Sequence, residues 1–562
     1  MRPSTADAVR SLLLLRARTG WFETLALAAL WIVAVGIRAP YLWTAPAVGD
    51  DAGLLTQALL RSQAGVWSGS VSTSVGAVHE LLLAAVFALV GPSAYLPRLV
   101  TALQAALTIP LVYVLTRELC RPLGRRRIEE SFLMPRLAGL IATGLLATSA
   151  AHIVITSHVA RAESFTPLLV IALLYSVERA LNGRHGRWLL VAGALFGLAL
   201  QTSTLVLAIF PGLILALWWR ARSLVLSHWS ALAVLAFAGT YAGTLASMIQ
   251  HGGLSTGSVW AWIGAVRAST SAAGATPGPT GDMYLDSVGM ALVSVWRMLA
   301  GQLTSRATSD NILSDPLAWP FLVLALLGAL ILALRGRPLL PLVAISCLIV
   351  LPYVATETDP LLSGRYLMPV AIVAMVAIGV AVGALAPIVT GRGSLPRLAL
   401  GMVLGGLVLA PLGGLRGYYD DAARERQVSA GLLLVPDAVF DERRYDEVVL
   451  LDEQLARVRL GAGGNALEAL QYLLTASGVP TRTVTVTPQV LVAEGLASRA
   501  LIVVDRSSVS AVEAGARLTP LLDDWITSED GTADFMLFRT EGTPQQRLLD
   551  DGSLPIYAGV GV

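Results

Sequence analysis

Two adjacent carboxylates, Asp50 and Asp51, lie shortly after the first hydrophobic segment of the chain, and an apolar pattern at helical spacing follows over residues 54–60. In a partly dry pocket, two such groups raise each other's pKa, and one of them can take a proton from an acceptor hydroxyl. A solvated loop is the alternative for a bare Asp-Asp pair. The helical pattern that follows favours a site held against a membrane surface.

Two arginines are candidates for holding an anionic leaving group. Arg365 is predicted at the outer end of a hydrophobic span, where a guanidinium can bind a lipid-linked phosphate through two hydrogen bonds. Its alternative role is an interfacial anchor whose head group reaches the lipid headgroups. Arg161 faces the same choice, with Glu163 as a local ion-pair partner.

Histidines accompany these groups in two external segments. His79 and Glu80 are adjacent, and His158 precedes Arg161. Their spacing matches no established metal motif, so we predict no metal and expect structural or substrate-contact roles. We also expect no cofactor. No phosphate-cradling loop, nucleic-acid patch or Ser-His-Asp arrangement stands out in the chain, so nucleic acid is not an expected partner.

Composition indicates a polytopic α-helical membrane protein. Of 562 residues, 55% are hydrophobic and only 14% are charged, and the mean hydropathy is +0.68. The two cysteines lie in or beside hydrophobic segments, which disfavours a disulfide framework. The arginines ahead of residue 21 predict a retained first span with a cytoplasmic N-terminus.

Hydrophobic segments and arginine clusters together predict about eleven spans. The segments are Trp21–Ile37, Tyr95–Leu119, Leu133–Ala150, Phe165–Leu181, a pair within Trp188–Trp219, Trp229–Ile249, Leu317–Leu334, Leu339–Ala355, Leu367–Pro387 and Leu395–Leu412. The pair is expected to turn near Gln201-Thr-Ser-Thr. We interpret Val78–Val90 as a juxtamembrane helix, because otherwise the arginines of residues 117–136 would lie outside. External loops are then expected at residues 39–77 and 250–316.

The charge divides the chain into two predicted domains. Residues 416–562 hold 13 Arg against 22 Asp and Glu, a net charge of −9, which leaves residues 1–415 with +11. An acidic tail on a basic membrane body predicts an extracytoplasmic C-terminal domain. Its pattern is α/β, with strands expected at 447–452, 482–487 and 500–505 and a helix at 467–475.

The sequence on both sides of the carboxylate pair resembles the first external loop of the GT-C glycosyltransferases. The segment runs Arg38-Ala-Pro-Tyr-Leu, then Asp50-Asp51-Ala, then Gly65-Val-Trp67. It is most similar to family 39 protein O-mannosyltransferases and bacterial relatives that include the lipid A aminoarabinose transferases. Three further segments resemble elements of that family in order and spacing: Gly91-Pro-Ser-Ala-Tyr-Leu-Pro-Arg98-Leu, Ser157-His158-Val-Ala-Arg161-Ala-Glu163 and Ser363-Gly364-Arg365-Tyr366-Leu367-Met368-Pro369.

This resemblance implies transfer of a sugar from a polyprenyl-phosphate carrier to an acceptor hydroxyl on a protein, lipid or glycan. Asp50 matches the family's catalytic base, whereas Asp51 stands where Glu is usual. Ser203 replaces a Lys that relatives often place near the donor phosphate, and residues 78–81 lack the prolines of the corresponding family segment.

The expected location is the bacterial cytoplasmic membrane, with membrane lipids as partners and the site on the extracytoplasmic face. The C-terminal domain is expected to cover the site or to present the acceptor. Two alternatives remain at this point. One is a transporter or flippase for a lipid or glycan, and the other is a membrane-anchored scaffold with a vestigial transferase site.

Overall fold

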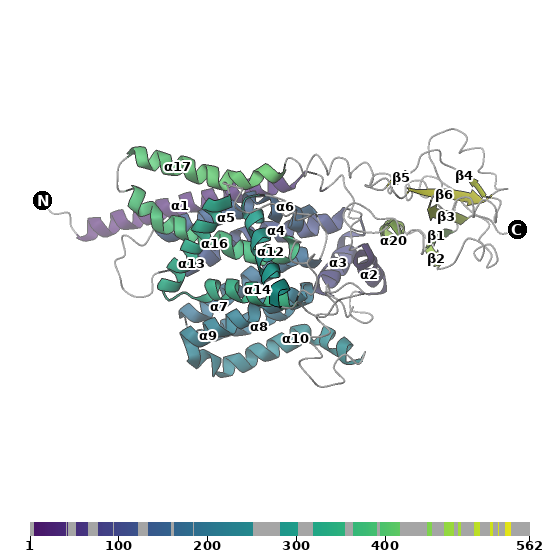
Figure 1. Cartoon of the computed structure of the whole chain (residues 1–562), viewed down its shortest axis with the longest axis horizontal. Coiled ribbons are helices and arrows are strands. Elements are labelled where there is room, and N and C mark those ends of the chain that lie inside the picture. The colour runs from purple at the N-terminus through teal and green to yellow at the C-terminus, as the bar shows by residue number, and fades with distance from the viewer. Residues whose placement is uncertain are drawn as a thin grey trace.

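The structure is a computed structural model of the whole chain, in which a helical bundle is followed by a small mixed sheet (Figure 1). It describes residues 5–40, 42, 52–65, 77–93, 95–121, 133–158, 162–183, 185–250, 281–301, 318–354, 364–390, 394–415, 447–451, 466–476, 481–484, 500–505, 518–520, 526–527 and 534–540. Asp50, Asp51 and Arg161 lie outside these residues, as do Trp67 and the other parts of the loops.

The helices of the first half are α1 (Thr5–Arg38), α2 (Ala52–Ala64), α3 (Ala77–Val90), α4 (Leu96–Leu119), α5 (Leu133–Thr148), α6 (Ala150–Ile153), η1 (Val154–His158), η2 (Ala162–Phe165), α7 (Thr166–Gly183), α8 (Arg187–Thr202), η3 (Thr204–Ile209), α9 (Phe210–Val225) and α10 (His228–Gln250). The later helices are α12 (Gly281–Leu299), α13 (Ala318–Leu334), α14 (Leu339–Val354), α16 (Gly364–Thr390), α17 (Ser394–Leu409), η5 (Ala410–Gly414) and α20 (Ala466–Ala476).

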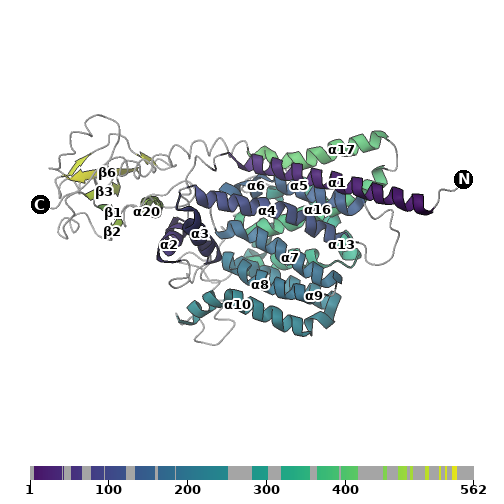
Figure 2. The same cartoon turned by 180° about the vertical axis from the view of Figure 1, so that it is seen from behind.

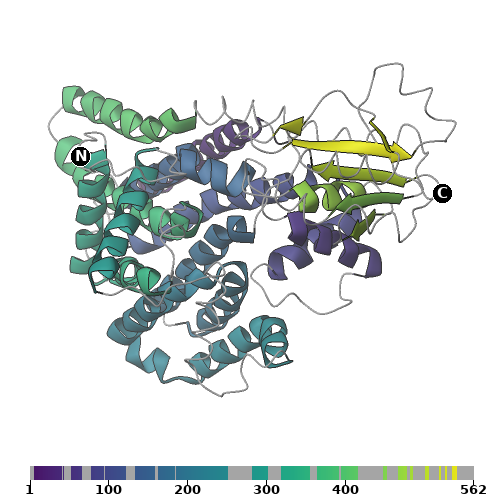
Figure 3. The same ribbon diagram turned by 45° about the vertical axis from the view of Figure 1, so that its right-hand side comes forward.

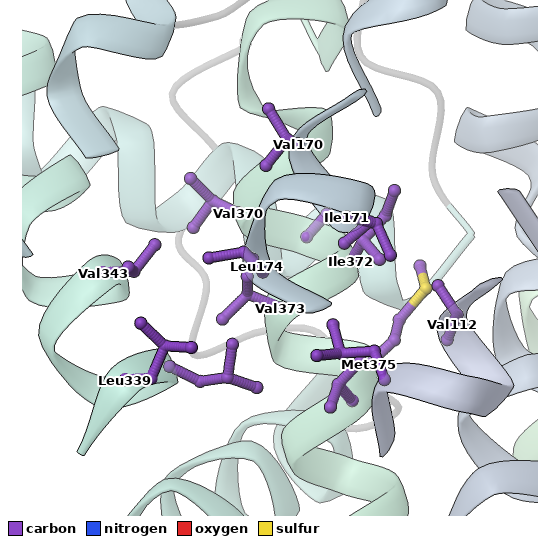
Figure 4. Close-up of a cluster of buried hydrophobic side chains, with 14 of the residues drawn as sticks. Val112, Val170, Ile171, Leu174, Leu339, Val343, Val370, Ile372, Val373 and Met375 are labelled. Carbon is purple, nitrogen blue, oxygen red and sulfur yellow. The ribbon is translucent and has the colours of Figure 1, made fainter. Parts of the chain in front are cut away.

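Helix α16 forms the centre of the bundle. It packs against α5, α7, α12, α13 and α14, and nearly all of its side chains from Leu367 to Val382 are buried. Figure 4 shows its Val370, Ile372 and Met375 meeting apolar side chains of α4, α7 and α14. Two glycines allow the close approach of neighbouring backbones, because a Cβ on Gly328 would collide with the carbonyl of Ala377 and one on Gly379 with that of Ala138.

Two helical segments are broken at polar residues. Helix α5 ends before Ser149, whose side chain accepts a hydrogen bond from the backbone N–H of His152 and so starts α6. The two pieces meet at a bend of 61°. Helix α8 ends at Ser203, which is extended, and η3 follows. The predicted turn at residues 201–204 is therefore confirmed.

Six helices within the described residues are long and apolar enough to cross a membrane, and the bent pair at residues 135–157 makes a seventh if it is one span. Shorter apolar helices occupy Ala77–Val90, Arg187–Thr202, Trp319–Leu334 and Leu339–Leu351. The chain is thus a polytopic α-helical membrane protein, while the predicted total of eleven spans stays a prediction. Helix α3 has 14 residues, about 21 Å of length, which is shorter than the hydrocarbon layer.

Charged side chains gather at one end of the bundle, which we call the arginine end and define by Arg121, Arg179, Arg220 and Arg337. Arg337 is buried and pairs with Glu178, and Arg220 lies 2.8 Å from the same carboxylate. Arg121 and Arg179 lie 3.0 and 3.3 Å from Glu118. These contacts join the ends of α4, α7 and α9 to the turn before α14.

The C-terminal sheet has the strand order β2-β1-β3-β6-β4, with β5 also paired to β6. Its strands are β1 (Glu447–Leu451), β2 (Thr481–Val484), β3 (Ala500–Asp505), β4 (Leu518–Pro520), β5 (Ile526–Thr527) and β6 (Asp534–Thr540). Strand β1 is parallel to β2 and β3, and β6 runs antiparallel to β3. Helix α20 connects β1 to β2 as a βαβ unit. Strands and a helix therefore lie where the α/β pattern predicted them.

Figures 1 and 2 show α2, α3 and α20 between the helical bundle and the sheet, at the end of the bundle opposite the N-terminus. We call this end of the bundle the site end, defined by α2, α3, η2 and the start of α16. The arginine end and helix α2, the described part of the first predicted external loop, thus lie at opposite ends of the bundle (Figures 1 and 2).

Candidate active site

Helix α2 begins directly after the carboxylate pair in the chain. Ala52, its first residue, follows Asp51 directly in the chain, so the pair enters the structure at the N-terminus of this helix. Ala52, Leu55 and Leu59 are buried, and α2 packs against α3 on one side and α20 on another. The apolar pattern after the pair therefore forms the predicted helix, although the two carboxylates themselves lie outside the described residues.

Helix α3 is held to α2 by an ion pair. Nε of Arg61 donates to Oε1 of Glu80 over 2.6 Å, with both side chains buried. The neighbouring His79 is completely buried. Glu80 and His79 were predicted as substrate-contact or structural residues, and the geometry gives Glu80 the structural contact with Arg61.

Arg38 ties the end of α1 to the break between α5 and α6. Its guanidinium donates to the carbonyl oxygens of Ala34, Ala147 and Leu146, at 2.8, 3.0 and 3.4 Å, and lies 2.8 Å from Nδ1 of His152. Both residues are buried. Carbonyls at a helix end lack intrahelical partners, and the arginine satisfies two of those released by the break. Sequence reasoning assigned Arg38 no role of its own, because Leu146, Ala147 and His152 are more than 100 residues away in the chain.

Helix η2, which begins directly after Arg161 in the chain, lies at the site end. His158 ends a π-helical turn and Glu163 is half-buried in η2. Helix η2 contacts α3, α4, α7, α8 and α16. It therefore places the chain next to Arg161 close to the juxtamembrane helices and to the start of α16, which carries Arg365 as its second residue.

A pocket lies between the break at Ser203 and the start of α16, two places that the sequence linked to the donor. Its polar wall contains Thr166, Ser203 and Tyr366, and its apolar wall includes Leu205, Cys347 and Val370. Thr166 begins α7, and Tyr366 follows Arg365 directly. The hydroxyls of Thr166 and Thr202 are 2.8 Å apart, which fixes α7 against the end of α8 beside Ser203.

The pocket combines the hydroxyl-bearing Thr166, Ser203 and Tyr366 with apolar walls from η3, α14 and α16. Its free space is small, about 10 Å³, which is the room that one water molecule needs. Ser203 was predicted near a donor phosphate and lies on this pocket. Thr166 and Thr202 were missed, because isolated threonines in apolar helices carry no distinctive signal. Among the described residues, no group of three or more His, Cys, Asp or Glu side chains has the geometry of a metal site.

Comparisons with known proteins give similarity in structure alone. No family model matches the chain, and no curated protein matches it in sequence. The crystal structure of ArnT from Cupriavidus metallidurans bound to undecaprenyl phosphate is similar with a TM-score of 0.58 at 13% identity, over 92% of this chain and 98% of that chain. The apo structure of the same ArnT gives a TM-score of 0.58 at 14% identity, over 93% and 98%.

Proposed function

Because the chain has the fold of the GT-C membrane glycosyltransferases, we propose that it transfers a sugar from a polyprenyl-phosphate carrier to an acceptor hydroxyl. One observation carries the proposal beyond the fold. Two segments that the sequence linked to the donor border one pocket, the break at Ser203 and the start of α16 beside Arg365, and Thr166 at the start of α7 borders it as well. The ArnT structure with undecaprenyl phosphate supports the class of donor.

The reaction is a substitution at the anomeric carbon. Asp50 takes the proton of the acceptor hydroxyl, and the resulting oxygen attacks that carbon from the side opposite the phosphate. The bond from carbon to phosphate oxygen breaks with inversion, and its electron pair leaves with the lipid phosphate. The products are the glycosylated acceptor and the free polyprenyl phosphate.

Arginines stabilise the charge that develops on the leaving group. Arg365 forms two hydrogen bonds with the lipid phosphate, and Arg161 contributes a second positive charge. Ser203 lies where relatives place a lysine, so this chain depends on the two arginines for neutralisation. Tyr366 and Thr166 border the same pocket and are available to hold the sugar or phosphate oxygens.

The acceptor side is built on the first external loop. Asp51 and Glu163 provide further carboxylates around the acceptor, and the α2–α3 pair, with His79 and Glu80 inside it, supports them. The N-terminus lies in the cytoplasm of a bacterial cell, and residues 416–562 form an extracytoplasmic domain on the inner membrane. Acceptors are a protein, a lipid or a glycan of the cell envelope.

The test uses purified protein in lipid nanodiscs with a panel of polyprenyl-phosphate sugars and a cell-envelope extract as the acceptor source. Release of free polyprenyl phosphate is followed for wild type, Asp50→Asn and Arg365→Ala. We expect Asp50→Asn to lose on the order of 10²- to 10⁴-fold in rate, as for removal of a general base. Matched controls are Asp534→Asn in β6 and Arg397→Ala on α17, which should retain full activity.

Equal release by wild type and Asp50→Asn would show that Asp50 is not the base. Absence of release from every donor, with folded protein and extract present, would contradict the transferase and favour a scaffold. A second assay uses the protein in vesicles of the same lipid composition as the nanodiscs. Movement of the lipid-linked sugar from one leaflet to the other, without release of polyprenyl phosphate, would favour a flippase.

A further inference from the structure

Helix α20 of the C-terminal βαβ unit is docked on the juxtamembrane helices. Tyr472 is completely buried, and its hydroxyl donates to the carbonyl of Ser93 over 2.9 Å. Its ring centroid lies 6.5 Å from that of Phe87 in α3. Leu470 and Leu473 on the same helix are buried as well. Figure 3 shows α20 directly beside α2 and α3, so this helix is part of the site end.

Glu468 extends from α20 to the first turn of α2. A Cβ built on Gly53 would lie 3.5 Å from Cδ and from Oε2 of Glu468, and 3.8 Å from Oε1. Gly53 is the second residue of α2. The absence of a side chain at this position lets the carboxylate come close to the helix backbone.

A carboxylate is favoured at this place by the electrostatics of the helix. The first N–H groups of α2 have no partner within the helix, and the N-terminus carries a partial positive charge. Negative charge from another element therefore fixes the orientation of the first turn. Asp51 is two residues before Gly53, which limits the distance between their Cα atoms to about 7.6 Å.

We propose that Glu468 is a positioning residue, which the C-terminal domain places at the start of α2 to anchor the first turn of the helix that follows Asp50 and Asp51 in the chain. The inference rests on the proposed function, because it assigns the tail a part in that transferase site. The C-terminal domain then holds the start of the helix that follows the candidate base in the chain.

The first experiment measures transfer kinetics of the full chain in nanodiscs for wild type, Glu468→Gln and Glu468→Asp. We expect Glu468→Gln to lower kcat roughly tenfold with little change in the donor KM, since a small misplacement of a catalytic group costs rate. Glu468→Asp, which keeps the charge, should recover part of the loss. Glu447→Gln in β1 is the matched control, because its strand pairs only with β2 and β3 among the described strands.

A second measurement needs no donor and separates this inference from the proposed function. Amide hydrogen exchange of residues 52–59 should become faster in Glu468→Gln than in wild type, while exchange in α16 stays unchanged and Glu447→Gln behaves as wild type. Unchanged exchange in α2, or faster exchange with an unchanged kcat, overturns the positioning role. If the wild-type protein shows no sugar transfer, the proposed function is refuted. The amide hydrogen exchange of α2 in Glu468→Gln still decides whether Glu468 anchors that helix.

Discussion

Nε of Arg61 lies 2.6 Å from Oε1 of Glu80, and this ion pair joins the helix that follows the carboxylate pair to the juxtamembrane helix α3. The exposed fractions of the two side chains are 8% and 2%. A buried pair of this kind is costly to break, because the remaining charge loses its partner in a medium of low dielectric constant. It therefore fixes the geometry of the α2–α3 unit.

We predict that Glu80→Gln destabilises the protein by about 3 kcal/mol, in the range found when one member of a buried ion pair is removed. The double variant with Arg61→Gln should recover part of that loss. Thermal unfolding in detergent measures both. Arg121→Gln is the control, because Arg121 is mostly exposed beside Glu118 and exposed pairs contribute about 1 kcal/mol or less. Equal effects of Glu80→Gln and Arg121→Gln would contradict the structural role of Glu80.

The contact between Arg38 and His152 leads to a second prediction. Arg38→Lys keeps the charge but loses the planar group that reaches the carbonyls of Leu146 and Ala147 and the ring of His152 together. We expect a loss of about 1.5–3 kcal/mol of unfolding free energy, typical of hydrogen bonds to a charged group. Arg397→Lys, at an exposed position on α17, should change nothing. An unaltered melting temperature for Arg38→Lys would count against its role at the helix break.

The pKa of Tyr472 gives a prediction on pH. Burial raises the pKa of this phenol above its ordinary value near 10. The folded protein therefore holds the proton more tightly than the unfolded chain, so the contribution to stability is complete below about pH 10 and is lost as pH rises further. Stability attributable to Tyr472, measured as the difference between wild type and Tyr472→Phe, should be constant from about pH 6 to 9. A difference that shrinks within this interval would contradict the buried, protonated state.

The two cysteines should be inert in the folded protein. Burial raises the pKa of the Cys120 thiol to about 12, and Cys120 and Cys347 are only 6% and 3% exposed. Because the thiolate is the reactive form, maleimide should label neither at neutral pH, and both after unfolding in SDS. A Gln57→Cys variant, at an exposed position of α2, is the positive control. Rapid labelling of the unaltered folded chain would show that one of the two cysteines is accessible.

Local sequence patterns predicted the helices, breaks and strands that depend on residues close together in the chain. Small polar residues inside an apolar run gave the break at Ser203, and continuous apolar residues gave β1 and β3. The strand β6 was missed, since its pairing with β3 depends on a partner that is 30 residues away. The α/β pattern of the tail was visible, but its docking through Tyr472 was not.

The candidate site divides in the same way. Ser203 could be chosen from the sequence because it replaces a family lysine, and it lies on the pocket beside Tyr366. The roles of Arg38 and Glu468 depend on side chains brought together from distant parts of the chain, and periodicity carries no information about such contacts. Asp50, Asp51, Arg161 and Arg365 remain predictions about chemistry, made from the sequence.

The most direct test of the account is where a polyprenyl phosphate binds. Wild type in nanodiscs would be irradiated with a photoreactive undecaprenyl phosphate that carries its diazirine near the phosphate, and adducts would be mapped by peptide mass spectrometry. The account predicts adducts on α14 and α16 around Leu351 and Tyr366, competition by unlabelled undecaprenyl phosphate, and loss of labelling in Ser203→Trp. Labelling should persist in Leu326→Trp, at an exposed position of α13. Adducts spread over α13 and α17 without competition would contradict a donor site at this pocket.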